Sequence, residues 1–153
     1  MPISAPTVFL LPSLADVEES DAIITRAKMF VVDHHKEIFV KCDDGSITIG
    51  LMYLQRASDE FPFLDIIHEL CHVKKYLEGQ NLYNKDRSYV DRETEIEAYR
   101  GTVQEARRIG LSDEAITNYL GVSWITSKEH QRLAHRMDIP GEIRDYAQQL
   151  KTG

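Results

Sequence analysis

The chain has 153 residues, which is long enough to bury one hydrophobic core, and we expect a single domain over residues 1–153. Its formal net charge of −7 leaves no surplus of Lys and Arg to meet phosphates, which argues against nucleic-acid binding and against docking on a membrane surface. No apolar run approaches the roughly 20 residues of a membrane span.

The cysteine content and the N-terminal residues bear on the compartment. Cys42 and Cys71 are too few for a disulfide framework. The apolar run at residues 8–11 is too short for a secretory signal and has no basic stretch before it. We therefore expect a cytoplasmic protein in which Cys71 is a small buried apolar residue rather than a metal ligand or a reactive thiol.

The first part of the chain predicts a helix followed by three short strands. Residues 14–28 are typical of a helix with Ser13 as its N-cap. Strands are expected at residues 29–32, 38–40 and 47–49, with turns at 33–36 and 43–46. This spacing predicts a small antiparallel sheet. His34 and His35 lie in the first turn, where we expect solvated side chains.

Helices are expected through the rest of the chain, at residues 51–57, 63–78, 91–109, 111–119, 128–137 and 142–150. Gly79 and Gly110 end two of them, and Pro140-Gly141 separates the last two. Strands followed by helices predict the α+β class. We expect a core over about residues 28–110 and a C-terminal helical extension over about residues 111–153.

The segment His68-Glu69-Leu70-Cys71-His72 carries the chemistry. On a helix, residues i and i+4 share a face, so His68 and His72 can bind one Zn²⁺, with Glu69 beside the open coordination position. The rest of this helix is apolar, which predicts that it is buried. Buried imidazoles and a carboxylate need partners. A zinc ion with a water molecule is the partner that suits this set, and hydrogen bonds from the histidines to carbonyl groups are the alternative.

A catalytic zinc has three protein ligands and a water molecule, so a third ligand is required. The helix at residues 91–109 offers Glu93, Glu95 and Glu97. The apolar arc of that helix is formed by Ile96, Tyr99, Thr102, Val103 and Ala106. Only Glu95 falls inside this arc, where a carboxylate is out of place unless it is bound to something. We therefore favour Glu95 as the third ligand, with Glu97 next and Glu93 last.

Two other zinc families fit less well. The metzincin pattern requires Gly at position 75 and His at position 78, where this sequence has Lys75 and Glu78. Peptide deformylases take a cysteine ligand from a Glu-Gly-Cys context, which Lys41-Cys42-Asp43 does not match.

His-Glu-x-x-His followed on a later helix by Glu-x-x-Ala resembles the gluzincin metallopeptidases, which include the small ImmA/IrrE-type peptidases and the minigluzincins. In that pattern the ligand is the Glu three residues before Ala98, which is Glu95. The resemblance covers roughly residues 38–106 and implies a zincin-like domain. It also places the strand at residues 47–50 where such enzymes hold the substrate as an added β-strand. This chain departs from the ImmA/IrrE pattern at Cys71, at Tyr99 and at residues 101–102.

The expected function is that of a zinc metalloendopeptidase acting on a peptide or protein substrate. Glu69 would take a proton from zinc-bound water and pass it to the leaving amine. A further side chain should stabilise the developing oxyanion, and the candidates are Tyr99, Tyr76 and His130. One alternative is a zinc-binding regulatory or interaction module of the same fold with little or no turnover. Another is a structural domain without metal.

The C-terminal extension has no catalytic motif. We expect core positions at Trp124, Ile125, Leu133, Ala134 and Met137, and solvated side chains at His130 and His135. The helix–loop–helix rhythm is also compatible with a DNA-binding motif, but its second helix is only mildly basic. We favour a segment that covers one side of the catalytic cleft.

Overall fold

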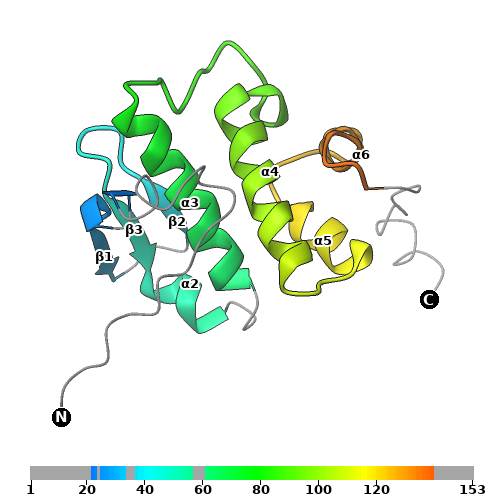
Figure 1. The fold of residues 1–153 in the computed structure, drawn as a ribbon, viewed down its shortest axis with the longest axis horizontal. Helices are drawn as coiled ribbons and strands as arrows, with labels where there is room; N and C mark the ends of the chain where they lie inside the picture. The colour runs from blue at the N-terminus through cyan, green and yellow to red at the C-terminus, as the bar shows by residue number, and fades with distance from the viewer. Residues whose placement is uncertain (1–21, 24, 34–36, 57–60, 140–153) are drawn as a thin grey trace.

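The computed structural model describes residues 22–23, 25–33, 37–56 and 61–139. Within these ranges a small mixed sheet and five α-helices form an α+β domain, as the order of the predicted elements indicated (Figure 1). Most of the helix expected at residues 14–28 lies outside the described residues, as do the helix expected at 142–150 and both His34 and His35.

The sheet consists of β1 (Met29–Val32), β2 (Ile38–Val40) and β3 (Ile47–Gly50), in the order β1-β3-β2. β2 runs antiparallel to β3, but β1 runs parallel to it. The prediction of an antiparallel sheet is therefore wrong for β1. The reason is that β3 is buried along its whole length, and such a strand takes the central position. β3 has no free edge, so the expectation that residues 47–50 receive an added strand is also wrong.

Helix α3 (Phe61–Leu77) is the central element of the domain. It follows α2 (Leu51–Arg56) and lies between the sheet and the later helices (Figure 1). Ile67, Leu70 and Val73 pack with the sheet, whereas Leu64 belongs to the core formed with the later helices. Because α3 is covered on both sides, its polar residues His68, Glu69 and His72 are buried as well. Cys71 packs in the sheet-side core, in agreement with its predicted apolar role.

Helix α4 (Glu93–Arg108) runs beside α3 (Figure 1). It begins two residues later than predicted because the 3-10 turn η2 (Tyr89–Asp91) precedes it. Its buried face is formed by Thr94, Glu95, Ala98, Tyr99, Gly101, Thr102, Val103, Glu105 and Ala106. The predicted burial of Glu95 is therefore confirmed, and this carboxylate faces α3.

The last two helices in the described part of the chain are α5 (Asp113–Leu120) and α6 (Ser127–Arg136). Ser112 caps α5 by accepting the Ala115 N–H at 3.1 Å, and Thr126 and Glu129 form a capping box at α6. α6 is joined to η2 by ion pairs of Arg132 and Arg136 with Asp91, at 2.8 and 2.9 Å. None of the helices in the described ranges is long and apolar enough to cross a membrane.

Three of the five expected core positions of the extension are buried, and Ile125 is partly buried against the same core. Leu133, Ala134 and Met137 are buried in the core shared with α4 and α5. Trp124, in contrast, is 60% exposed, so its predicted core position is wrong. Its ring makes an edge-on contact with Tyr89, with the centroids 5.7 Å apart.

Candidate metal centre

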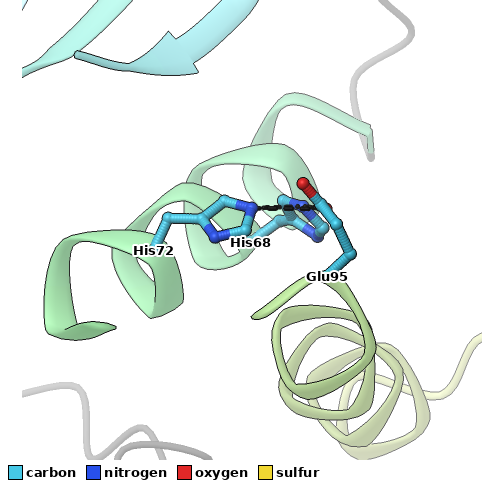
Figure 2. A group of neighbouring side chains, drawn as sticks. All are labelled: His68, His72 and Glu95. Atoms are coloured by element: carbon cyan, nitrogen blue, oxygen red, sulfur yellow. Dashed lines mark hydrogen bonds and ion pairs between the residues drawn. The ribbon is translucent and has the colours of Figure 1, made fainter. Parts of the chain in front are cut away.

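Two turns of α3 and the first turn of α4 bring three donor atoms together (Figure 2). The Glu95 Oε2 atom lies 3.1 Å from His68 Nε2 and 3.3 Å from His72 Nε2, and the two nitrogens are 3.1 Å apart. Ligand atoms at the corners of a zinc tetrahedron, with bonds of about 2.0–2.1 Å, lie about 3.3 Å apart. The three atoms thus have the separations of three corners of such a site.

All three side chains are buried, with 6% of His68, 2% of His72 and 2% of Glu95 exposed. The Nδ1 atoms of both rings have no hydrogen-bond partner within the described part of the chain. The polar contacts of the two rings are therefore made through Nε2, in the direction of Glu95. Two imidazole nitrogens and one carboxylate oxygen are a ligand set that catalytic zinc sites use, with the fourth position left for water.

The protonation states of Glu95 and His68 suit a cation, whereas that of His72 depends on the proton it shares with Glu95. Burial alone would raise the pKa of Glu95, but hydrogen bonds with His68 and His72 hold this pKa well below its usual range, so that the group is a carboxylate. Burial lowers the pKa of His68, which favours the neutral imidazole that a metal ion requires. Burial alone would lower the pKa of His72, but its hydrogen bond with Glu95 raises this pKa, which favours the protonated ring. A divalent cation would therefore meet Glu95 and His68 in the ionisation state that it requires and would displace a proton from His72.

The other two glutamates of α4 lie elsewhere. Glu97 forms an ion pair with Lys75 on α3, and Glu93 is exposed. Of the three candidates from the sequence, Glu95 alone is brought to the histidines.

Glu69 lies beside this triangle and is also buried. The backbone N–H of Val40 donates to its carboxylate, while its Oε2 has no partner among the described residues. Burial raises the pKa of Glu69 to about 8, and a divalent cation nearby would lower this pKa because it favours the anion. A carboxylate with one free oxygen beside a metal site can accept a proton from bound water.

A cavity of about 500 Å³ extends over these residues. Its walls come from β2, from the helices α2, α3, α4 and α5, from η2 and the segment before it, and from the loop that follows α5. Aromatic residues are prominent among them: Tyr53, Phe61, Tyr83, Tyr89, Tyr119 and Trp124. As expected for the C-terminal extension, α5 and the loop that follows it cover one side of the cavity.

No protein family, curated protein or solved structure gives a significant match to this chain. The resemblance of its motif to the gluzincins therefore remains a prediction.

Of the three candidates for oxyanion stabilisation, only Tyr99 lines the cavity. Its ring centroid lies 4.4 Å from that of His68, and its hydroxyl lies 2.9 Å from the hydroxyl of Tyr89. Burial raises the pKa of Tyr99 above its ordinary value, so the hydroxyl stays protonated. Tyr76 and His130 are not among the cavity residues.

Both of those residues contact backbone carbonyls instead. The Tyr76 hydroxyl donates to the carbonyl of Asp43 at 3.0 Å. His130 is half-buried, and its Nε2 lies 2.8 Å from the carbonyl of Thr117, so the prediction that it is solvated is wrong. His130 joins α6 to α5 and is placed to support the helix pair.

Asp65 and Tyr89 are among the cavity residues that were not identified from the sequence. Asp65 accepts hydrogen bonds from the hydroxyls of Tyr53 and Tyr119, the latter at 2.7 Å. A carboxylate on an apolar helix is the same signal that selected Glu95, so Asp65 could have been found. Tyr89 could not have been found in this way, because it lies in a short 3-10 turn and no hydrophobic periodicity predicts such a turn.

β2 is the edge strand on the cavity side, since Glu37, Ile38 and Phe39 line the cavity. Hydrogen bonds from Gly50 N–H to the Glu37 carbonyl at 2.9 Å and from Lys41 N–H to the Ser46 carbonyl at 2.8 Å fix its register with β3. In an antiparallel ladder such bonded pairs alternate, so the backbone groups of Ile38 and Val40 point away from β3.

The backbone groups of Val40 already have partners. Its carbonyl accepts the Tyr83 hydroxyl at 2.7 Å, and its N–H donates to Glu69. Ile38 is therefore the β2 residue at which an extended peptide could first add to the sheet.

Proposed function

We propose that this protein is a zinc-dependent metallopeptidase of the gluzincin type on a zincin-like domain. The observation that carries the proposal is the convergence of the His68, His72 and Glu95 donor atoms at 3.1–3.3 Å, beside Glu69, in an open cavity. We place it in the cytoplasm, as expected for a chain whose Cys42 and Cys71 are both free.

The chemistry follows from these positions. His68, His72 and Glu95 would hold the ion, and a zinc ion bound there would supply a water molecule of lowered pKa and a Lewis acid for the scissile carbonyl. Glu69 Oε2 accepts a proton from the attacking water and delivers it to the leaving nitrogen. The hydroxyl pair of Tyr99 and Tyr89 donates a hydrogen bond to the carbonyl oxygen as negative charge develops on it.

The substrate is a peptide in extended conformation, added to the edge of β2 that pairs with no strand in the described part of the chain. Backbone hydrogen bonds at Ile38 would hold it in this position. This assignment moves the substrate strand from residues 47–50, where the sequence resemblance placed it, to β2.

The test is an analysis of zinc content together with hydrolysis of a fluorogenic peptide library. One zinc per chain is expected in the wild-type protein and in Glu69→Gln. Loss of the general base should reduce the hydrolysis rate by about 10²–10⁴-fold. Full activity of Glu69→Gln on a peptide that the wild type cleaves would contradict the mechanism.

A second candidate function is a zinc-binding regulatory or interaction module. The occupied backbone groups of Val40 favour it, because Tyr83 and Glu69 stand where an added strand would pair. Bound zinc without hydrolysis of any library member, in both the wild type and Tyr83→Phe, would support this second candidate.

A further inference from the structure

The cavity is acidic, and no cationic side chain lines it in the described part of the chain. Four carboxylates line it, those of Glu37, Asp65, Glu69 and Glu95, without any Lys or Arg. A divalent ion at the metal centre would balance two of these charges. Two would remain, on Asp65 and Glu37, and neither residue forms an ion pair with the described residues.

Asp65 lies on α3 three residues before His68, among aromatic rings. Its two oxygens accept the hydroxyls of Tyr53 and Tyr119. These phenols orient the carboxylate, but they are neutral and leave its charge in place. Phe61 extends the aromatic lining, with its ring edge-on to Tyr119 and the centroids 5.3 Å apart. Asp65 is thus a carboxylate held in an aromatic environment, without a counter-cation among the residues that the structure describes.

An organic cation fits this environment better than a second metal ion. A hard metal ion requires several oxygen ligands, which the rings do not supply. The stem of a Lys or Arg side chain packs on aromatic rings, its charge is attracted to their faces, and a carboxylate binds its polar end. We therefore propose that the part of the cavity around Asp65 is a specificity subsite, in which Asp65 selects a Lys or Arg side chain of the peptide.

The position of Asp65 relates the subsite to the scissile bond. Side chains three residues apart on a helix are neighbours, with about 5–6 Å between their Cβ atoms. The selected side chain therefore belongs to a residue close to the bond that is cleaved over the metal centre. Glu37, at the start of β2, adds a second carboxylate beside the path of the added strand. The inference rests on the proposed function, because the peptide must lie over the same cavity.

Binding tests the subsite independently of turnover. The zinc-loaded full chain carrying Glu69→Gln is titrated with blocked alanine hexapeptides that bear one Lys, Arg, norleucine or Glu at each position in turn. Trp124 is the single tryptophan of the sequence and lines the cavity, so its fluorescence reports binding. We expect the best Lys or Arg peptide to bind about tenfold more tightly than its norleucine counterpart, and the Glu peptide to bind most weakly.

Two protein variants and one modified peptide test whether Asp65 causes this preference. Asp65→Asn should reduce the Lys-over-norleucine ratio to about twofold or less. Glu114→Gln removes the same charge from an exposed position of α5 outside the cavity and should leave the ratio unchanged. If Asp65→Asn does not fold, acetyl-lysine in place of Lys removes the charge from the peptide instead, and the same loss of affinity is expected.

The possible results separate the subsite from the enzyme. Equal binding of Lys and norleucine peptides, a ratio that Asp65→Asn leaves unchanged, or no saturable binding of any peptide would overturn the subsite. Hydrolysis of peptides without preference for Lys or Arg would also overturn it while leaving the peptidase intact. A binding preference for Lys or Arg together with a wild type that hydrolyses none of these peptides would support the subsite and count against the peptidase.

Discussion

Glu95 Oε2 lies 3.1 Å from His68 Nε2, although the two residues are 27 positions apart in the sequence. The contact depends on α4 running beside α3, and on η2, which sets where α4 begins. If Glu95 is the third metal ligand, Glu95→Ala should weaken zinc binding by roughly 100-fold or more. Loss of a residue that only hydrogen-bonds to a metal ligand typically weakens metal binding by about 10–100-fold, and loss of a ligand itself should have a larger effect. Competition with a chromogenic chelator measures this affinity.

The matched control for that experiment is Glu97→Ala. Glu97 pairs with Lys75 outside the donor triangle, so its loss should leave zinc affinity unchanged. A loss of zinc in Glu97→Ala and not in Glu95→Ala would reverse the assignment of the ligand.

Zinc should stabilise the folded chain. At a free zinc concentration about 100 times the Kd, binding to the native state alone contributes about 2.7 kcal/mol. For a chain of this size that corresponds to a rise in Tm of roughly 5–10 °C. Scanning calorimetry with and without chelator measures it. His72→Ala should abolish the rise and Glu69→Gln should retain it; equal Tm values with and without zinc would favour a domain without metal.

The parts of the site that were predicted from sequence all lie on long helices. The helical period of α3 places His68 and His72 on one face, and the period of α4 separates the buried Glu95 from the exposed Glu93. These predictions succeed because each helix repeats its apolar pattern over several turns, so that one misplaced polar residue is informative.

The parts that were not predicted depend on contacts between distant segments. The short strand β1 has no local feature that distinguishes pairing with β2 from parallel pairing with β3. Trp124 was assigned to the core from its apolar character alone, in a loop where no periodicity shows which side is buried. The cavity walls at Tyr89 and Tyr119 exist only because η2 and α5 are packed against α3 and α4.

Tyr83 should restrain peptide binding at β2. Its hydroxyl donates a hydrogen bond to the Val40 carbonyl at 2.7 Å, so an added strand that pairs with this carbonyl must displace the hydroxyl. If the chain is the peptidase we propose, Tyr83→Phe should lower KM by about two- to tenfold, because a typical hydrogen bond contributes about 0.5–1.5 kcal/mol, while kcat stays the same. Tyr76→Phe is the control, since its hydroxyl also donates to a carbonyl but outside the cavity. A raised KM in Tyr83→Phe would instead mean that this hydroxyl contacts the substrate.

Gly45 should tolerate no side chain. Its φ of +71° favours glycine, and an added Cβ would overlap the ring of Tyr76. Gly45→Ala should destabilise the protein by about 2–4 kcal/mol in chemical denaturation, about 1 kcal/mol from backbone strain and about 1–3 kcal/mol from the overlap. Gly110→Ala is the control, because Gly110 has a similar φ of +88° but no neighbouring atom within 4 Å of the added carbon. It should cost only about 1 kcal/mol. Equal losses for the two variants would mean that the Tyr76 ring moves aside at no cost.

Asp91 should stabilise the contact between α6 and η2 in a pH-dependent way. A hydrogen bond from Ser88 and the neighbouring Arg132 and Arg136 lower the pKa of Asp91 below its ordinary value. Its stabilising effect is therefore present at neutral pH, above the pKa of the unfolded chain, and is lost as pH falls through the lower pKa of the folded state. Asp91→Asn should reduce the free energy of unfolding at pH 7 by up to about 1 kcal/mol, because these ion pairs are partly exposed. Urea unfolding of both proteins at pH 7 and near pH 3 measures the difference, which should shrink at the lower pH; a difference that stays constant would mean that the charge of Asp91 does not contribute.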